Sequence, residues 1–395
     1  MADGTSIEWT DATWNPIRAR DRDTGKLGWF CTHASPGCAN CYAEPINRRL
    51  GTGVDYKPGH LDRIEVFLDE AALLKPLSWR RPRVIFVGSM TDLFGDFVTD
   101  EMLDRVFAVM ALCPQHVLQV LTKRQERMRA YLSRPATARR VWELACDMVV
   151  EHGFGVTLLA HPSHASLAPA GRHVHVGRWP VPNVWLGVSV EDQRRADERI
   201  PVLLETPAAV RWISAEPLLG AINLRRIRIA PNHHTILDAL DGYAIASTPT
   251  QPGRPARTML DWVVAGGESG PGARPMHPDW ARGLRDQCAT AGVPFLFKQW
   301  GEWAPICEIG ESDDLYHPAP EQHPEARRRC RHANLVMHDD GAIFDLGTAN
   351  DYHRRVTMGA FAAGSKAMTM FAIGKKAAGR LLDGVTHDGF PEARR

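Results

Sequence analysis

Arg83-Val-Ile-Phe-Val-Gly-Ser-Met-Thr-Asp92 is a short apolar, β-branched run that ends in a polar turn. The same unit recurs along the chain: an apolar run, then a polar or glycine-rich turn, then a segment with helical spacing. Near-continuous apolar strands that alternate with helices are typical of a parallel sheet covered on both faces, so the sequence predicts an α/β fold. The predicted strands are 27–30, 83–88, 116–121, 184–188, 210–213, 262–265 and 294–297.

The repeated units carry no dinucleotide-type glycine fingerprint, which favours a (β/α) barrel, or a partial TIM-like barrel, over a doubly wound sheet. The site of such a barrel lies at the carboxyl ends of its strands. A single polar residue there is often an ordinary helix cap, but a polar residue after six strands predicts a shared site. These strand-end residues are Asp92, Lys123, Glu191, Glu216, Glu268 and Lys298.

The barrel is predicted over residues 1–301, with insertions near 158–182 and 229–258. The first insertion is rich in His and Pro and predicts a solvated loop; the second is rich in Pro, Thr and Ala and predicts a flexible excursion. Residues 302–395 are predicted to form a C-terminal α+β subdomain. It would contain a small β element (334–337 and 342–344) and a short helix and turn at 373–384.

Composition excludes several classes of protein. The 395 residues have a formal net charge of +1, so a polyanion site would have to be a local patch. The first residues lack the features of a secretory signal, and no apolar run approaches the ~18 residues that span a bilayer. We therefore expect a cytoplasmic protein without membrane contact. In a reducing compartment, eight cysteines indicate metal binding or free thiols rather than disulfides.

Three cysteines, Cys31, Cys38 and Cys41, lie within eleven residues, after the first predicted strand. Three thiolates can hold a [4Fe-4S] cluster by three of its irons and leave the fourth iron open to a substrate or cofactor. A structural zinc site is the alternative, and it would need a fourth ligand. Candidate fourth ligands are His33, Cys307 and Cys330.

Several longer phrases are specific enough to suggest a family. They are 7–16 (IEWTDATWNP), 38–44 (CANCYAE), 189–192 (SVED), 214–218 (SAEPL), 265–270 (AGGESG), 297–301 (FKQWG) and 374–380 (GKKAAGR). On these phrases the chain resembles a phage- and mobile-element-associated family of unknown function that carries a three-cysteine motif. The three-cysteine loop after the first strand of a partial barrel is similar to that of the radical S-adenosylmethionine superfamily.

The resemblance implies a [4Fe-4S] cluster on Cys31, Cys38 and Cys41, whose open iron would chelate S-adenosyl-L-methionine. Reduction by an electron donor such as a flavodoxin or ferredoxin would then give methionine and a 5′-deoxyadenosyl radical. The chain departs from the superfamily pattern in two places. Six residues, rather than three, separate the first two cysteines, and Asn40 stands where an aromatic residue packs near the adenine. Tyr42 is the candidate replacement.

The same comparison suggests contacts to S-adenosylmethionine. Ser89 and Asp92 stand where the superfamily's amino-group contact lies, and Lys123 would pair with the carboxylate. Glu191 or Glu216 would bind the ribose hydroxyls. Other candidates are the strand-end residue Glu268 and the Gly266-Gly267 turn, which either approaches the cofactor closely or is an ordinary tight turn.

Arginine clusters at 18–22, 48–49, 80–83 and 124–129, together with Trp9 and Trp14, suggest a nucleic-acid or nucleotide substrate, and hence nucleic-acid modification or DNA repair. Buried anchoring of the two tryptophans is the alternative, as are solvated faces for the arginines. Two other functions remain open. One is a zinc-stapled nucleic-acid-binding protein without catalysis; the other is a cluster used for structure or redox sensing.

Overall fold

The computed structural model describes residues 4–5, 7–159, 172–229, 235–246, 254–255, 258–310, 315, 332–345 and 366–392. The chain divides into two compact units, each treated by itself below. Unit 1 comprises Met1–Ser189, Glu198–Ile213 and Ala256–Asp261; unit 2 comprises Val190–Asp197, Ser214–Pro255 and Trp262–Arg395. The boundary predicted between residues 301 and 302 lies inside unit 2.

The chain is a mixed α/β protein whose main sheet has seven strands and curls like half of a barrel. The strands follow the order β1-β5-β6-β9-β10-β15-β16, and the pairs β1–β5, β5–β6, β6–β9 and β15–β16 are parallel. Six of the strands coincide with the runs predicted from residue 83 onward. The seven are β1 (Ala12–Trp14), β5 (Val84–Val87), β6 (Val117–Thr122), β9 (Val184–Ser189), β10 (Val210–Ala215), β15 (Trp262–Gly266) and β16 (Phe295–Gln299).

The prediction for the first strand of this sheet was wrong. Only Leu27–Gly28 of the predicted run is a strand (β3), and it pairs antiparallel with β2 (Ile17–Asp21) in a sheet completed by β4 (Ile64–Leu68). The main sheet begins with β1, where Trp14 is fully buried and its Nε1 donates to the Ala72 carbonyl at 2.7 Å. The cysteine loop therefore leaves a small antiparallel sheet rather than a strand of the half-barrel.

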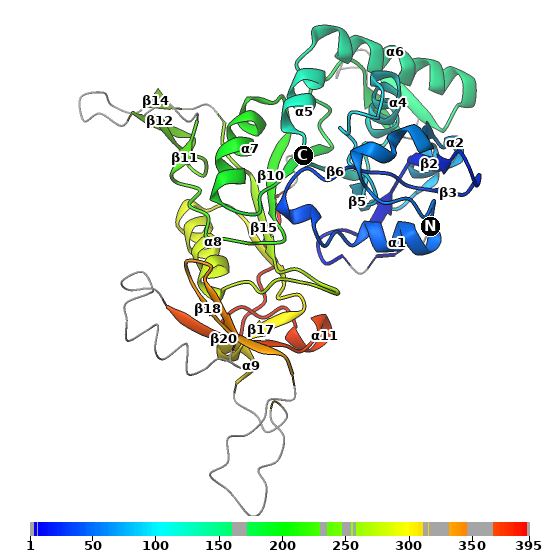
Figure 1. The fold of residues 1–395 in the computed structure, drawn as a ribbon. Coiled ribbons are helices and arrows are strands. Elements are labelled where there is room, and N and C mark those ends of the chain that lie inside the picture. The colour runs from blue at the N-terminus through cyan, green and yellow to red at the C-terminus, as the bar shows by residue number, and fades with distance from the viewer. Residues whose placement is uncertain are drawn as a thin grey trace, which may run out of the picture. The chain divides into compact units, whose positions relative to one another are not determined.

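Helices pack around the strands of unit 1, where α4 and α6 lie against each other (Figure 1). Thr99 caps α4: its hydroxyl accepts from the Met102 N–H at 3.3 Å, and Asp100 and Glu101 complement the helix dipole. The helices in the described ranges are α1 (Ala43–Leu50), α2 (Glu70–Leu73), α3 (Lys75–Ser78), α4 (Asp100–Ala111), α5 (Gln125–Leu132), α6 (Pro135–His152), α7 (Gln193–Glu205), α8 (Pro278–Ala291), α9 (Ile306–Ile309) and α11 (Lys375–Ala378), with 3-10 turns η1 (Pro36–Cys38) and η2 (Pro58–Arg63). None of them is long and apolar enough to cross a membrane.

Unit 2 contains the small C-terminal sheet that the sequence predicted. Strands β17 (Trp303–Pro305), β20 (Ala367–Ala372), β18 (Asn334–His338) and β19 (Ile343–Asp345) pair antiparallel in this order, with α11 beside them (Figure 1).

Both predicted insertions contain strands that the sequence analysis did not assign. In the first, β7 (Val156–Leu159) pairs in parallel with β8 (Arg172–His175); His161 and His164 lie outside the described residues. In the second, the strands β12 (Thr235–Asp238), β13 (Tyr243–Ala246) and β14 (Arg254–Pro255) form an antiparallel sheet with β11 (Ile227–Arg228), which directly precedes the predicted excursion.

Candidate functional site

The cysteine loop of unit 1 is wound by two consecutive turns. Pro36 opens the 3-10 turn η1, in which the Cys38 N–H donates to the Ser35 carbonyl at 2.9 Å. The Cys41 N–H then donates to the Cys38 carbonyl at 3.3 Å, and α1 starts two residues later. The Cys38 Sγ accepts from the Ala34 N–H at 3.4 Å. These two turns keep the loop compact, although it contains no helix or strand longer than the single turn of η1.

The three cysteines form no disulfide with the described residues, and their side chains are partly buried. Cys31 and Cys41 pack against an apolar cluster that includes Phe30, Tyr56 and Met90. Burial, with a smaller contribution from Asp92, raises the pKa of Cys31 to about 12, and Arg124 opposes this shift. Burial also raises the pKa of Cys41, against an opposing effect of Lys123. Without a bound metal the thiols of Cys31 and Cys41 stay protonated, and a metal would have to drive their ionisation.

The thiols interact with one another and with two cations. Cys41 interacts electrostatically with both Cys31 and Cys38, which makes the three thiols neighbours. Within the described ranges, no three His, Cys, Asp or Glu side chains converge on a single metal-ion position. His33, a candidate fourth zinc ligand, places its Nε2 3.1 Å from Glu44 Oε2. Another candidate, Cys330, lies outside the described residues.

Asp92 stands after β5, next to the cysteine loop, and is 8% exposed. Its Oδ1 accepts from the Thr122 hydroxyl (2.6 Å) and the Phe94 N–H (3.0 Å), and its Oδ2 from the Lys123 N–H (2.9 Å) and Arg124 Nη1 (2.9 Å). A carboxylate offers about four lone-pair sites, so these four bonds use its accepting capacity. Asp92 therefore fastens the ends of β5 and β6 together and orients Arg124.

The sequence analysis included Arg124 in a basic cluster but did not nominate it as a residue of the cysteine site. Its guanidinium is bound by Asp92 on one side and by Thr32 on the other, with Nη2 donating to the Thr32 carbonyl at 2.7 Å and to the Thr32 hydroxyl. Thr32 follows Cys31 directly. Arg124 thus joins the end of β6 to the cysteine loop. The available signal was its place in the polar turn that follows β6.

Tyr42 and Ser89 form a second link between the loop and the end of β5. The Tyr42 hydroxyl donates to the Ser89 carbonyl at 2.5 Å, although 52% of the tyrosine is exposed. The Ser89 hydroxyl lies 2.9 Å from Asn15 Nδ2, and the Met90 N–H donates to Asn15 Oδ1 at 3.0 Å. Asn15 follows β1, so the ends of two neighbouring strands position Ser89.

Lys123 lies between the cysteine loop and the end of β9. Its Nζ donates to the Ser189 hydroxyl at 3.2 Å. Unit 1 therefore gathers, at one set of strand ends and the adjoining loop, seven of the residues that the sequence analysis nominated. They are Cys31, Cys38, Cys41, Tyr42, Ser89, Asp92 and Lys123.

The remaining nominated residues belong to unit 2. Glu216, after β10, forms an ion pair with Lys298 of β16, with Nζ and Oε1 2.6 Å apart. Glu268, after β15, binds Arg274 through both oxygens, at 2.6 Å and 2.8 Å. Glu191 is fully buried and acts electrostatically on Arg274. These residues form a second charged cluster at strand ends.

The two glycines after β15 differ in what surrounds them. A Cβ on Gly267 would lie 1.9 Å from the Trp300 carbonyl oxygen, so this glycine is required for close packing of the chain against itself. A Cβ on Gly266 would lie 3.5 Å from Glu216 Cδ and 3.4 Å from Lys298 Cβ, which is ordinary contact. Gly266 therefore borders the second cluster, whereas Gly267 shapes the turn.

Several of the arginines that suggested a nucleic-acid surface have partners within the protein. Arg20 pairs with Glu65, Arg48 with Asp55, and Arg129 with Glu126 and Glu205. Arg18 stacks over Trp29 and Arg83 over Trp79. Trp9 and Trp14 are 5% and 0% exposed, which confirms the alternative that both anchor the N-terminal segment. A nucleic-acid substrate stays a prediction without support from these residues.

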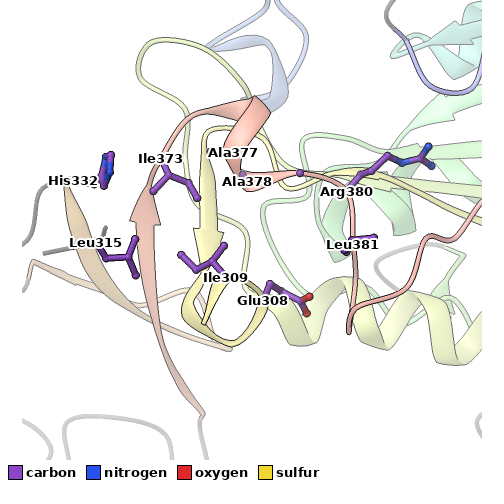
Figure 2. Close-up of a pocket in the computed structure, with 10 residues that line it drawn as sticks. Glu308, Ile309, Leu315, His332, Ile373, Ala377, Ala378, Arg380 and Leu381 are labelled. Carbon is purple, nitrogen blue, oxygen red and sulfur yellow. The ribbon is translucent and has the colours of Figure 1, made fainter. Parts of the chain in front are cut away.

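A cavity of about 420 Å³ lies in unit 2, beside β20 and α11 (Figure 2). Ile309, Leu315 and Ile373 point into it, and the guanidinium of Arg380 is directed away from them (Figure 2). Glu308 at its edge accepts from the Asp383 N–H at 2.9 Å. The cavity wall combines apolar side chains with Glu308, His332 and Arg380, and it includes none of the residues nominated as site residues from the sequence.

Comparison with models of known protein families gave a match that covers nearly the whole chain. The model of an uncharacterised family, "Protein of unknown function (DUF5131)", matches residues 4–391. The chain belongs to this family. Membership in DUF5131 covers both units, and so both polar clusters, but carries no assigned activity. No curated protein and no solved structure matches the DUF5131 chain.

Proposed function

We propose that this DUF5131 protein is a radical S-adenosylmethionine enzyme with a TIM-like partial barrel, in which Cys31, Cys38 and Cys41 hold a [4Fe-4S] cluster. One observation carries the proposal: three neighbouring, partly buried thiols lie beside Asp92, Lys123 and Arg124 at the carboxyl ends of parallel strands. This donor set suits a cluster that takes one thiolate per iron and leaves one iron open.

The electrostatics of the loop also support an anionic cluster. Three thiolates give such a cluster net negative charge, and Lys123 and Arg124 favour the ionised forms of Cys41 and Cys31. A backbone hydrogen bond at Asp92 favours the Cys31 thiolate as well. Hydrogen bonds and nearby charges of this kind also tune the potential of a cluster.

When bound, the cluster and S-adenosylmethionine would supply one-electron chemistry that starts hydrogen abstraction from a substrate, with electrons from a flavodoxin or ferredoxin. The chain's own residues bind and orient. Lys123 would bind the carboxylate, because a charged partner forms a stronger bond than the Ser189 hydroxyl it now contacts. Ser89, which Asn15 orients, would contact the amino group, and Tyr42 would border the adenine.

Asp92 has a positioning role in this proposal, because its oxygens already accept four hydrogen bonds. Through Arg124 it holds Thr32, and so the start of the cysteine loop, against the strand ends. A nucleic acid or nucleotide is the substrate class that we propose to test first.

Anaerobic purification followed by iron, sulfide and zinc analysis tests the metal centre. We expect a brown protein with about four irons per chain, and loss of iron in Cys38→Ala. Cys146→Ala is the matched control, since Cys146 is a partly exposed thiol on α6 and is not part of the cysteine loop. A colourless protein with one zinc per chain would contradict the proposal and favour a zinc-stapled binding protein. A cluster that never cleaves S-adenosylmethionine would indicate a structural or redox-sensing role.

A further inference from the structure

One wall of the cavity in unit 2 is the phrase 374–380 (GKKAAGR), to which the proposed function assigns no role. Gly374 and Gly379, at the two ends of α11, have φ angles of 87° and 69°, which favour glycine. The Gly379 carbonyl accepts from the Trp300 N–H at 3.1 Å, and the Leu381 carbonyl accepts from Trp300 Nε1 at 2.7 Å. These bonds hold the wall of the cavity against the end of β16.

The size and lining of this cavity are those of a small-molecule site. Ligand cavities measure about 300–1,000 Å³ and combine an apolar wall with a few polar groups. Here about 420 Å³ is enclosed, and the apolar side chains of Ile309, Leu315 and Ile373 lie between His332 and Glu308 in the view of Figure 2. All the lining residues belong to unit 2, so the cavity is independent of the cysteine loop in unit 1.

Glu308 supplies an acceptor that a ligand can use. Its side chain is only 4% exposed, and its Oε1 accepts from the Asp383 N–H at 2.9 Å and from Arg282 Nη2 at 3.4 Å. Within the described residues, its Oε2 makes no hydrogen bond. A carboxylate offers about four lone-pair sites, two on each oxygen. A donor on a bound molecule would therefore complete the hydrogen bonding of Glu308.

Arg380 is the other charged residue of the wall, and its guanidinium is directed away from the apolar side chains (Figure 2). Its Nη2 donates to Asp388 and, at 3.5 Å, to the Phe297 carbonyl. An anionic ligand would thus meet the Glu308 carboxylate without a guanidinium to neutralise it, which disfavours phosphates and carboxylates. The charge of the wall favours a cation instead.

We propose that this cavity binds a small organic amine. The apolar body of the amine would cover Ile309, Leu315 and Ile373, and its protonated amino group would donate to Glu308. A hydrogen bond between an ammonium group and a carboxylate is about twice as strong as one between neutral groups. Contact with an apolar ring or chain also removes apolar surface from water. The same cavity should reject the corresponding acid, because a second carboxylate beside Glu308 is repelled.

Calorimetry on the full chain tests the proposal with three indoles that differ in one group. Tryptamine carries an ammonium group at neutral pH, tryptophol carries a hydroxyl, and indole-3-propionate carries a carboxylate. We expect tryptamine to bind most tightly and indole-3-propionate at least about 10-fold more weakly, because a hydrogen bond to a charged group contributes at least about that factor.

Two variants assign the binding to this cavity. Glu308→Gln should weaken tryptamine binding by about 10-fold or more and tryptophol binding by less than about 3-fold. Ala377→Phe, at an exposed position of the wall, should weaken both by filling the space without changing Glu308. Asp286→Asn is the matched control: the Asp286 side chain is 66% exposed, pairs with Arg285 and does not line the cavity.

Thermal unfolding identifies a variant that fails to fold, and the order of the three indoles on the unmodified chain does not depend on any variant. Equal binding of tryptamine and indole-3-propionate, or no binding of tryptamine, would overturn the inference. Tryptamine binding that both folded variants leave unchanged would overturn it as well.

Discussion

Replacing Arg124 with Gln should destabilise the folded protein by about 3 kcal/mol. The guanidinium makes a charged hydrogen bond to Asp92 and two bonds to Thr32, and its side chain is only 14% exposed. Removing one partner of a buried ion pair costs about 3–5 kcal/mol. We expect the lower end of this range, because Asp92 keeps its bonds from Phe94, Thr122 and Lys123.

Urea unfolding followed by tryptophan fluorescence measures this loss. With a slope of about 3 kcal/mol per molar urea, the midpoint should fall by about 1 M. Arg129→Gln is the matched control, since Arg129 lies on α5, is 38% exposed, and pairs only at the surface. Surface pairs contribute about 0–1 kcal/mol, so the control midpoint should move little. Equal midpoints for the two variants would refute the role of Arg124 as the link between β6 and the cysteine loop.

Two further predictions concern packing and charge. Gly267→Ala should lower the thermal midpoint strongly and Gly266→Ala only slightly, because the new Cβ would lie 1.9 Å from the Trp300 carbonyl oxygen in the first and 3.4 Å from its nearest neighbour in the second; similar midpoints would contradict this reading. Arg63 holds the pKa of Asp21 well below its usual range, so the folded state gains stability from this pair above about pH 4 and loses it on acidification. The destabilisation by Asp21→Asn should therefore shrink between pH 7 and pH 2, and a constant difference would argue against it.

The strands from residue 83 onward were predictable because each is a near-continuous apolar run bounded by a polar turn. β1 was not, because Ala12–Trp14 is three residues long and has no periodicity to detect. It is a strand through tertiary contacts, namely parallel pairing with β5 and the bond from Trp14 to the Ala72 carbonyl. The strands β11 to β14 are similarly short and lie in a segment whose composition is typical of loops.

The candidate site, like β1, could be predicted from the sequence only in part. The polar residues that follow the predicted strands were enough to predict both polar clusters, because the carboxyl ends of parallel strands lie at one edge of a sheet. The sequence did not show which of these residues position others and which are available to a ligand. For example, Thr32 and Arg124 form a hydrogen bond although they lie 92 residues apart in the sequence. Whether Asp92 has free oxygens or four bonded ones depends on the geometry of three segments.

Reductive cleavage of S-adenosylmethionine is the most direct test of whether Cys31, Cys38 and Cys41 hold a reactive cluster. The anaerobically reconstituted chain, reduced with dithionite, should release 5′-deoxyadenosine and methionine. Cys38→Ala should abolish the product and Cys146→Ala should leave it unchanged. Absence of 5′-deoxyadenosine from a chain fully loaded with iron, or equal release by both variants, would contradict the proposed function.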